Sequence, residues 1–208
     1  QKNDEYCLLI MGFPGSGKKA TANSILLKHS FNSTPCTVSL PYIKCSRYDG
    51  NHVTIVNGLV LSTDTNKMNE YADKFKEALS QHSGGYHAVV WTIPLGFRFI
   101  EAVPLVQHIE KNFGKYFLQN FCILAITYAD YFDLSETKCD TIEDWCRNQE
   151  GEFKTLVDEC QGRLVYFDNR TKDHNEKIHQ KECVFRMIDK MLTQNCKLKY
   201  NKKNVSTP

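Results

Sequence analysis

The sequence predicts a doubly wound α/β domain, in which helices cover both faces of a mostly parallel, six-stranded sheet. Short apolar runs alternate with segments of helical periodicity along the 208 residues, the order that parallel strands with crossover helices produce. The runs are rich in Val, Ile, Leu and aromatic residues, as strands buried on both faces are. The first run leads directly into GFPGSGK and then into a helical pattern, which is typical of a phosphate loop.

Six strands are predicted from apolar or alternating runs that end at turn residues. Clusters of Gly, Pro, Asn and Asp separate these runs from the segments that follow them. The predicted strands lie near residues 6–11, 42–48, 52–57, 87–93, 121–127 and 163–167.

Apolar residues at helical spacing predict helices in the intervals between the strands. Thr141 is predicted to open a long helix that runs to Cys160, with Asp144 as its capping-box partner. Gly151 would lie inside that helix, where glycine is tolerated at some cost. The other predicted helices cover residues 18–28, 67–81, 101–112 and 173–192.

Length and charge indicate one domain with localised binding sites. A chain of this size can bury one sizeable core, so we predict a domain over residues 1–196 and a frayed basic tail over residues 197–208. The 26 basic and 24 acidic residues give a net charge of +2, which excludes binding of nucleic acid or membrane over the whole surface. No apolar run is long enough to span a bilayer.

The cysteine pattern favours a cytoplasmic protein. Nine cysteines are scattered along the chain without a C-x-x-C pair, which is typical of reduced thiols rather than of a disulfide framework or a zinc site. Three N-x-[ST] sequons, at Asn32, Asn169 and Asn204, support the alternative of a secretory route. The sequence starts at Gln1 rather than Met, which we interpret as a processed chain or an excised domain.

The stretch that starts at Gly12 matches the pattern G-x-x-x-x-G-K-[ST] except at its last position. In such a loop the backbone N–H groups surround the β-phosphate, and the N-terminus of the following helix adds positive potential. The lysine neutralises the β- and γ-phosphate oxygens. The alternative is a glycine-rich turn with a chance lysine. The predicted phosphate-binding residues are Gly12, Gly15, Ser16, Gly17, Lys18, Lys19 and Ala20.

Lys19 stands where the pattern has the Ser or Thr whose hydroxyl binds magnesium. An ammonium group has no lone pair for a metal and repels a dication. It can bring positive charge to the phosphates, which replaces part of the electrostatic work of the metal but not its geometry. We therefore predict no metal ligand at this position, nucleotide binding with weak Mg²⁺ dependence, and slow or absent hydrolysis.

Five blocks of the sequence, in order, resemble the immunity-associated GTPase family, also called the GIMAP or AIG-type G-domain family. The stretch GFPGSGKKATANSILL is similar to the family's G-x-x-G-x-G-K-S-A-T-G-N-S-I-L, and further blocks follow up to residue 192. The resemblance implies a P-loop NTPase fold of the G-domain type with GTP or GDP as ligand. It also implies GTPase activity in the family and self-association as a homodimer through the G domain.

The base side keeps the family pattern. In the T-x-x-D segment TYAD, the resemblance implies that Asp130 accepts the N1–H and N2–H groups of guanine, a pairing that adenine does not offer. Asn169 matches the family's guanine-contacting Asn, Tyr128 is expected to stack on the base, and Asp168 is expected to shape the turn. The alternative is that Thr127 and Asp130 only cap the next helix. The predicted guanine-binding residues are Tyr128, Asp130 and Asn169.

The metal side departs from the family pattern. Where the family has D-x-x-G, this chain has Asn57-Gly58-Leu59-Val60, so an amide replaces the magnesium-holding carboxylate and a β-branched residue replaces the glycine that meets the γ-phosphate. Departures confined to this side favour a nucleotide binder that has lost catalysis. The predicted switch residues are Thr34, Thr37, Asn57 and Val60.

Two other functions stay open from the sequence alone. One is a pseudo-GTPase that serves as a protein-interaction module and binds no nucleotide. The other is a P-loop small-molecule kinase, which would need an acceptor and would not distinguish guanine from adenine. Asp130 and Asn169 argue against the kinase, because they match residues that read guanine.

Overall fold

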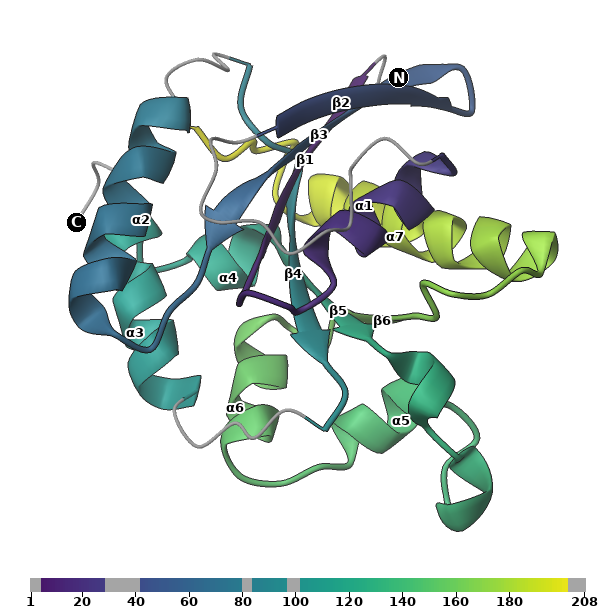
Figure 1. Ribbon diagram of the computed structural model, residues 1–208. Coiled ribbons are helices and arrows are strands. Elements are labelled where there is room, and N and C mark those ends of the chain that lie inside the picture. Colours follow the sequence, from purple (N-terminus) through teal and green to yellow (C-terminus); the bar gives the residue numbers. More distant parts are fainter. Residues whose placement is uncertain (1–4, 29–41, 80–83, 97–101, 202–208) are drawn as a thin grey trace.

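The computed structural model describes residues 5–28, 42–79, 84–96 and 102–201, which form an α/β fold around one six-stranded sheet (Figure 1). The strand order is β2-β3-β1-β4-β5-β6, with β2 antiparallel to β3 and the other neighbours parallel. All six predicted strands and the doubly wound class are confirmed. The strands are β1 (Glu5–Gly12), β2 (Tyr42–Tyr48), β3 (Asn51–Val60), β4 (Ala88–Pro94), β5 (Cys122–Thr127) and β6 (Leu164–Phe167).

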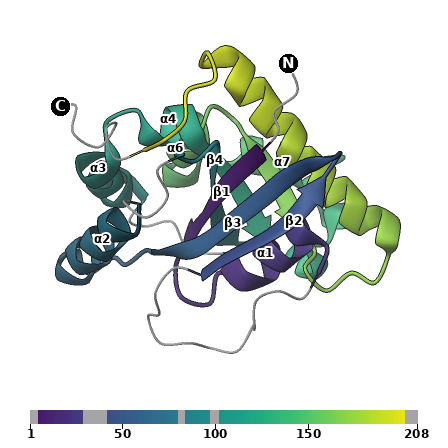
Figure 2. The same cartoon turned by 90° about the horizontal axis from the view of Figure 1, so that it is seen from above.

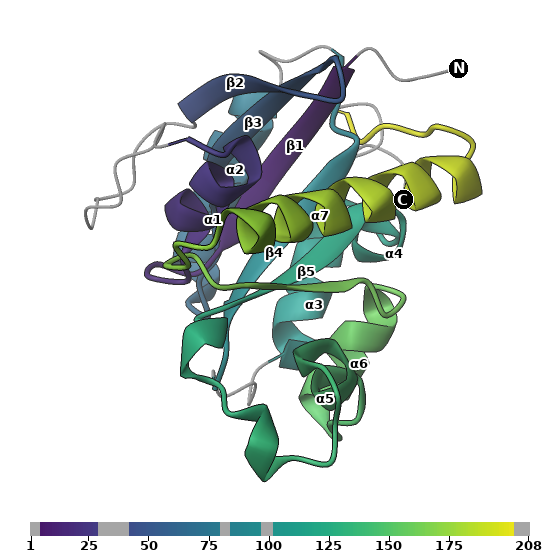
Figure 3. The same ribbon diagram turned by 90° about the vertical axis from the view of Figure 1, so that its right-hand side faces the viewer.

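Helices cover both faces of this sheet (Figures 2 and 3). Two of them, α1 and α7, pack on one face, and α2, α3, α4 and α6 pack on the other. The helices are α1 (Lys18–Leu26), α2 (Thr65–Leu79), α3 (Ala102–Phe113), α4 (Phe117–Phe121), α5 (Ile142–Arg147), α6 (Glu152–Glu159) and α7 (His174–Gln194), with 3₁₀ turns at Ala129–Tyr131 and Leu134–Glu136.

The central strand shows why the strands read as continuous apolar runs. In β1, Leu9 and Met11 point into the core beneath α2, α3 and α6, whereas Leu8 and Ile10 point into the core beneath α1 and α7. All four side chains are fully buried. Both faces of the strand are therefore removed from water, and alternation between apolar and polar residues is lost.

The long helix predicted from Thr141 to Cys160 is wrong, because the chain forms α5 and α6 instead. Gly151 precedes α6 with φ 71° and ψ −146°, a backbone region open essentially to glycine alone. A helix cannot continue through that conformation. The predicted cap is confirmed, since Thr141 Oγ1 accepts a hydrogen bond from the Asp144 N–H at 3.0 Å. The Asp144 carboxylate accepts from Arg147 Nη1 at 3.2 Å.

The expectation of a frayed tail is wrong for residues 197–201. Tyr200 is only 1% exposed, and its backbone forms an antiparallel bridge with Tyr86, with N···O distances of 2.8 and 2.7 Å. Its ring lies 4.7 Å from that of Phe117 and 5.4 Å from that of Phe121, measured between centroids. An aromatic anchor thus attaches this segment to the domain next to α4. Residues 202–208 lie outside the described part of the chain.

Two further findings concern membrane insertion and the cysteines. Within the ranges described above, no helix combines the length and the apolar character needed to cross a bilayer. The cysteines whose side chains the structure describes are free thiols, which agrees with the prediction of reduced cysteines. These are Cys7, Cys122, Cys139, Cys146, Cys160, Cys183 and Cys196.

Candidate functional site

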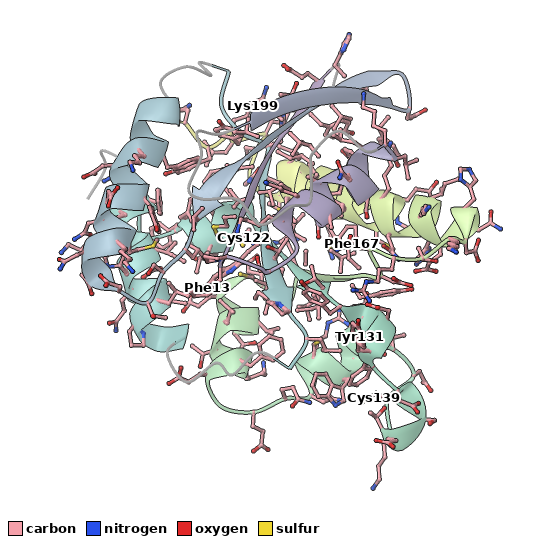
Figure 4. The ribbon with its side chains drawn as sticks, in the orientation of Figure 1. Phe13, Cys122, Tyr131, Cys139, Phe167 and Lys199 are labelled. Atoms are coloured by element: carbon pink, nitrogen blue, oxygen red, sulfur yellow. The ribbon has the colours of Figure 1, made fainter. Side chains whose placement is uncertain are left out.

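Three loops meet at the carboxyl edge of the parallel strands, where ligands of doubly wound sheets bind. They follow β1, β5 and β6, and Figure 4 labels a residue in or beside each of them, namely Phe13, Tyr131 and Phe167. The loop after β1 is the predicted phosphate loop. The turns after β5 and β6 carry the predicted guanine-binding residues. The fold therefore brings the two halves of the predicted site to one edge.

Lys18 lies folded over the phosphate loop at the start of α1. Its Nζ donates hydrogen bonds to the carbonyl oxygens of Gly12 at 2.9 Å and Phe13 at 2.7 Å. Burial, and to a smaller extent the charge of Lys19, lowers the pKa of Lys18 to about 8. Both effects disfavour the charged form of Lys18. An anion beside the ammonium group would offset them and would itself be stabilised by the positive charge.

The first turn of α1 offers its backbone donors to a ligand. The N-cap is Gly17, at φ 86°, which has no side chain to cap the helix, and the first turn contains no acidic residue. The N–H groups at a helix N-terminus have no partner within the helix. Together with the helix dipole they attract phosphate oxygens. Lys18, Lys19 and Ala20 lie in this turn, and their contacts with phosphate stay a prediction.

Thr92, near the end of β4, supports the phosphate loop through hydrogen bonds of its hydroxyl group. Its hydroxyl donates to the carbonyl of Met11 at 3.1 Å, so the 2.7 Å contact with Ser16 Oγ has the serine as donor. Both hydroxyl-bearing residues are buried. A Cβ on Gly12 would lie 2.4 Å from Thr92 Oγ1, so glycine is required there. The sequence reasoning missed Thr92, although a polar residue within the apolar run VVWTIP was a signal.

The turn after β5 fixes the phosphate loop from a second direction. Thr127 Oγ1 donates to the carbonyl of Ser16 at 2.9 Å, and the Tyr128 hydroxyl donates to the carbonyl of Gly15 at 2.8 Å. Tyr128 holds the left-handed conformation, with φ 61°, which costs a non-glycine residue about 1 kcal/mol or more. Its side chain is partly exposed beside the loop. Tyr128, which is predicted to stack on the base, therefore also links the turn after β5 to the phosphate loop.

Asp130 lies in the 3₁₀ turn that follows Tyr128. Its side chain is 21% exposed, and its Oδ2 lies 3.9 Å from Nη1 of Arg170, in the turn after β6. Arg170 Nη1 also donates to the Tyr131 hydroxyl, and the guanidinium carbon lies 5.5 Å from the centre of the Tyr131 ring. The carboxylate is thus accessible and has one loosely held cationic neighbour. It does not cap a helix through any hydrogen bond that the structure shows among the described residues.

Asn169 faces α1. Its Oδ1 accepts from Ser24 Oγ at 2.8 Å, and its Nδ2 donates to Thr21 Oγ1 at 3.1 Å. The amide has one further hydrogen and one further lone pair, so the guanine contact of Asn169 stays a prediction. Asp168 shapes the turn as expected, because its Oδ1 accepts from the backbone N–H of Arg170 at 2.8 Å.

The metal side is formed by the end of β3. Asn57 is in register with Ile10, and Val60 is in register with Gly12, with a bulge in the ladder between these pairs. The N–H of Leu61 donates to the Gly12 carbonyl at 3.1 Å. The segment that replaces D-x-x-G therefore runs directly beside the phosphate loop. Thr34 and Thr37, the other predicted switch residues, lie outside the described residues.

A metal centre built from protein side chains alone is absent among the described residues. In the part of the chain that the structure describes, no group of three or more His, Cys, Asp or Glu side chains is arranged to hold a metal ion. A nucleotide-bound magnesium needs fewer protein ligands than that, because phosphates and water supply the rest. At this loop, the position that normally supplies a hydroxyl carries Lys19.

Comparisons with known proteins identify relatives over nearly the whole chain. The AIG1 family model matches residues 6–207. Immune-associated nucleotide-binding protein 9 from Arabidopsis thaliana is 24% identical over 198 residues, which cover 93% of this chain and 57% of that protein. GTPase IMAP family member 8 from Homo sapiens is 25% identical over 194 residues, which cover 92% of this chain and 27% of that protein. The chain thus spans less than two thirds of either relative.

Solved structures show the same fold at lower sequence identity. Toc33 from Arabidopsis thaliana, in complex with GDP and Mg²⁺, has a TM-score of 0.64 and 18% identity, over 92% of this chain and 86% of that chain. A dimerization-deficient mutant of Toc33 gives a TM-score of 0.65 and 17% identity over the same shares. Because sequence identity is so low, these structures support the fold and not the activity.

Proposed function

Because this chain belongs to the AIG1 family, we propose that it binds the guanine nucleotides GDP and GTP, with weak dependence on magnesium and with slow or absent hydrolysis. The names of the relatives, an immune-associated nucleotide-binding protein and a GTPase, support the ligand class. The finer points of the proposal rest on the site itself.

The hydrogen bond from the Tyr128 hydroxyl to the Gly15 carbonyl is the main observation that supports the proposal. It joins the turn that would read the base to the loop that would hold the phosphates. A bound nucleotide needs both at the same time, since phosphate contacts supply most of the attraction and base contacts supply selectivity.

Selectivity for guanine would come from Asp130. An accessible carboxylate beside the phosphate loop can accept the N1–H and N2–H groups of guanine together. Adenine presents an unprotonated N1 and no exocyclic amine at position 2, so it would leave the carboxylate unpaired. A site built around such a pairing rejects the analogue that lacks it, because the carboxylate, once covered by the base, then has no donor to pair with.

Weak dependence on magnesium would follow from Lys19. Lys18 and Lys19 place two cationic residues in the first turn of α1, and a phosphate chain can be neutralised by them without a metal. A dication at the same place would be repelled by the ammonium group. Slow hydrolysis would follow for the same reason, because positioning of water and metal determines the rate of phosphoryl transfer.

Self-association through the G domain is part of the proposal. A mutant of the structural neighbour Toc33 is described as dimerization-deficient, which indicates that dimers form in that protein. For this chain we expect a larger molar mass in light scattering with a non-hydrolysable GTP analogue than with GDP. An unchanged mass with both nucleotides would contradict a nucleotide-dependent dimer.

Isothermal titration calorimetry tests nucleotide binding directly. We expect GDP to bind, ADP to bind far more weakly, and the GDP affinity to change less than about threefold, or 0.7 kcal/mol, when EDTA replaces Mg²⁺. Binding that is lost in EDTA would contradict the role given to Lys19. Failure of GDP and GTP to bind under both conditions would identify a pseudo-GTPase. Equal affinity for GDP and ADP would favour the kinase alternative.

A further inference from the structure

Arg170 has a position in the candidate base site that its motif does not explain. It follows Asn169 in the turn after β6, and its Nη1 lies 3.9 Å from Asp130 Oδ2. The same Nη1 donates to the hydroxyl of Tyr131, and the guanidinium carbon lies 5.5 Å from the centre of the Tyr131 ring. The backbone of Arg170 is fixed as well, through its N–H and Asp168. The turn therefore presents a guanidinium directly beside the carboxylate.

The Asp130 carboxylate is an acceptor and the Arg170 guanidinium is a donor. Together they complement the edge of guanine that carries N1, N2 and O6. That edge carries two donors, N1–H and N2–H, next to one acceptor, O6. Adenine in the same orientation has an acceptor at N1 and a donor at position 6, so both contacts would be opposed. Arginine is a frequent partner of guanine O6 because its planar fork donates several hydrogens in fixed directions.

We infer that Arg170 is a specificity-determining residue, which donates a hydrogen bond to guanine O6 while Asp130 accepts from N1–H and N2–H. This inference rests on the proposed function and names a second residue that reads the base. It differs from the expectation from the sequence, which gave the second guanine contact to Asn169.

The neighbours of Arg170 make this role available at low cost. The pair with Asp130 is long, and the arginine side chain is 68% exposed, so the pair contributes little to folding stability. Moving the guanidinium a short distance onto a base would break no buried interaction. Asn169, in contrast, already uses an amide hydrogen and a carbonyl lone pair for Thr21 and Ser24 of α1. Arg170 is therefore the more available donor of the two.

The test compares wild-type protein with Arg170→Met, which keeps a long flexible side chain and removes all donors. GDP, IDP and ADP are titrated by calorimetry in the same buffer. We expect the substitution to weaken GDP and IDP by about the same factor, roughly tenfold, because both bases carry O6. ADP affinity should stay the same or rise, since the substitution removes a donor that opposes the adenine amine.

Two controls separate base reading from charge and from folding. Arg170→Gln removes the charge and keeps N–H donors, so it should retain part of the preference for GDP over ADP if a hydrogen bond to O6 is the cause, whereas an effect of charge on the diphosphate would be lost in it as in Arg170→Met. Arg186→Met removes an equal charge from an exposed arginine of α7 and should leave the ratio of GDP to ADP affinity like that of wild type. Thermal unfolding of each variant should match wild type, because the replaced groups are exposed.

The outcomes distinguish this inference from the proposed function. If wild-type protein binds neither GDP nor GTP, both fail. If wild-type protein binds GDP selectively and Arg170→Met keeps the same ratio of GDP to ADP affinity, only the role of Arg170 is overturned. That role is also overturned if Arg170→Met weakens GDP and ADP equally, since such a loss would be a charge effect on the phosphates.

Discussion

The two sides of the phosphate loop differ in how much of the fold depends on them. On the side that faces β4 and β5, the loop is held by hydroxyl groups of Thr92, Thr127 and Tyr128. On the side that faces β3, the family's metal-binding positions carry Lys19 and the segment that ends at Val60. The first set of contacts shapes the loop before any ligand arrives, whereas the metal-binding residues of the family act only on a ligand.

Under the proposed function, this difference would explain how the site could bind a nucleotide with little help from a metal. Replacing Thr92 would remove the acceptor of the Ser16 hydroxyl and one hydrogen bond to the Met11 carbonyl, which costs folding stability as well as binding. Replacing a magnesium-binding hydroxyl by Lys19 breaks none of these contacts. Substitution on the metal side is therefore tolerated by the fold, and under the proposed function it would affect catalysis without removing nucleotide binding.

Substitution of Lys18 should produce the largest loss of affinity. Lys18→Met removes the cation that would lie against the phosphates, and charge-assisted hydrogen bonds of this kind contribute about 2–3 kcal/mol. We expect GDP to bind at least about 30-fold more weakly, measured by calorimetry. Lys67→Met, which removes an equal charge from the exposed start of α2, is the matched control and should bind GDP like wild type. Equal losses in both variants would show that only net charge matters.

A hydroxyl at position 19 should restore dependence on magnesium. In Lys19→Ser the hydroxyl offers a ligand to Mg²⁺ and the repulsive ammonium is gone, so we expect Mg²⁺ to tighten GDP binding by about tenfold, or 1.4 kcal/mol. Lys19→Met removes the charge without supplying a ligand and is the matched control. The comparison between the two sides of the loop would fail if Mg²⁺ tightened binding to wild type and to Lys19→Met as strongly as to Lys19→Ser.

The pH dependence of binding should report the protonation of Lys18. In the empty site its pKa is lowered to about 8, and a phosphate beside it raises that pKa, so binding takes up a proton at higher pH. Affinity should fall about tenfold between pH 7 and pH 9. The Lys18→Met variant should show a flat profile over this range. A flat profile in wild type would mean that Lys18 does not face the phosphates.

Much of the fold could be predicted because burial on both sheet faces leaves a direct record in the sequence. Apolar runs identified all six strands. The break at Gly151 could not be predicted, because glycine within a helical pattern signals either a tolerated cost or a positive φ, and only the surrounding packing selects one. Tyr200 was missed because its partners, Tyr86 and Phe117, are distant in the sequence and a basic segment surrounds it.

Some residues of the candidate site could likewise be predicted from a local motif, and others could not. Lys18 and Asp130 could be identified because a motif fixes their spacing from a glycine loop or a strand end. The roles of Thr92 and Arg170 depend on which side chains different strands bring together at one edge, and no local pattern encodes that. Asn169 illustrates the limit, since its motif indicates a base contact while its side chain hydrogen-bonds to α1.

The smallest expected effect concerns the link between the two halves of the site. Tyr128→Phe removes the hydroxyl that donates to the Gly15 carbonyl and keeps the aromatic ring. The backbone cost of the left-handed conformation is the same for both residues, because both carry a Cβ and an aromatic ring. The variant therefore isolates one hydrogen bond, which contributes about 1 kcal/mol, or roughly fivefold in affinity.

That loss should depend on the phosphates of the ligand. We expect Tyr128→Phe to weaken GDP by about fivefold and to leave the inhibition constant of guanosine, measured by competition, within about twofold. The reason is that the ring still supports the base, whereas the phosphate loop has lost one of the contacts that fix its carbonyl groups. An equal loss for GDP and guanosine would place the hydroxyl at the base or ribose instead, and the phosphate loop would then be held by β4 and β5 without help from the base turn.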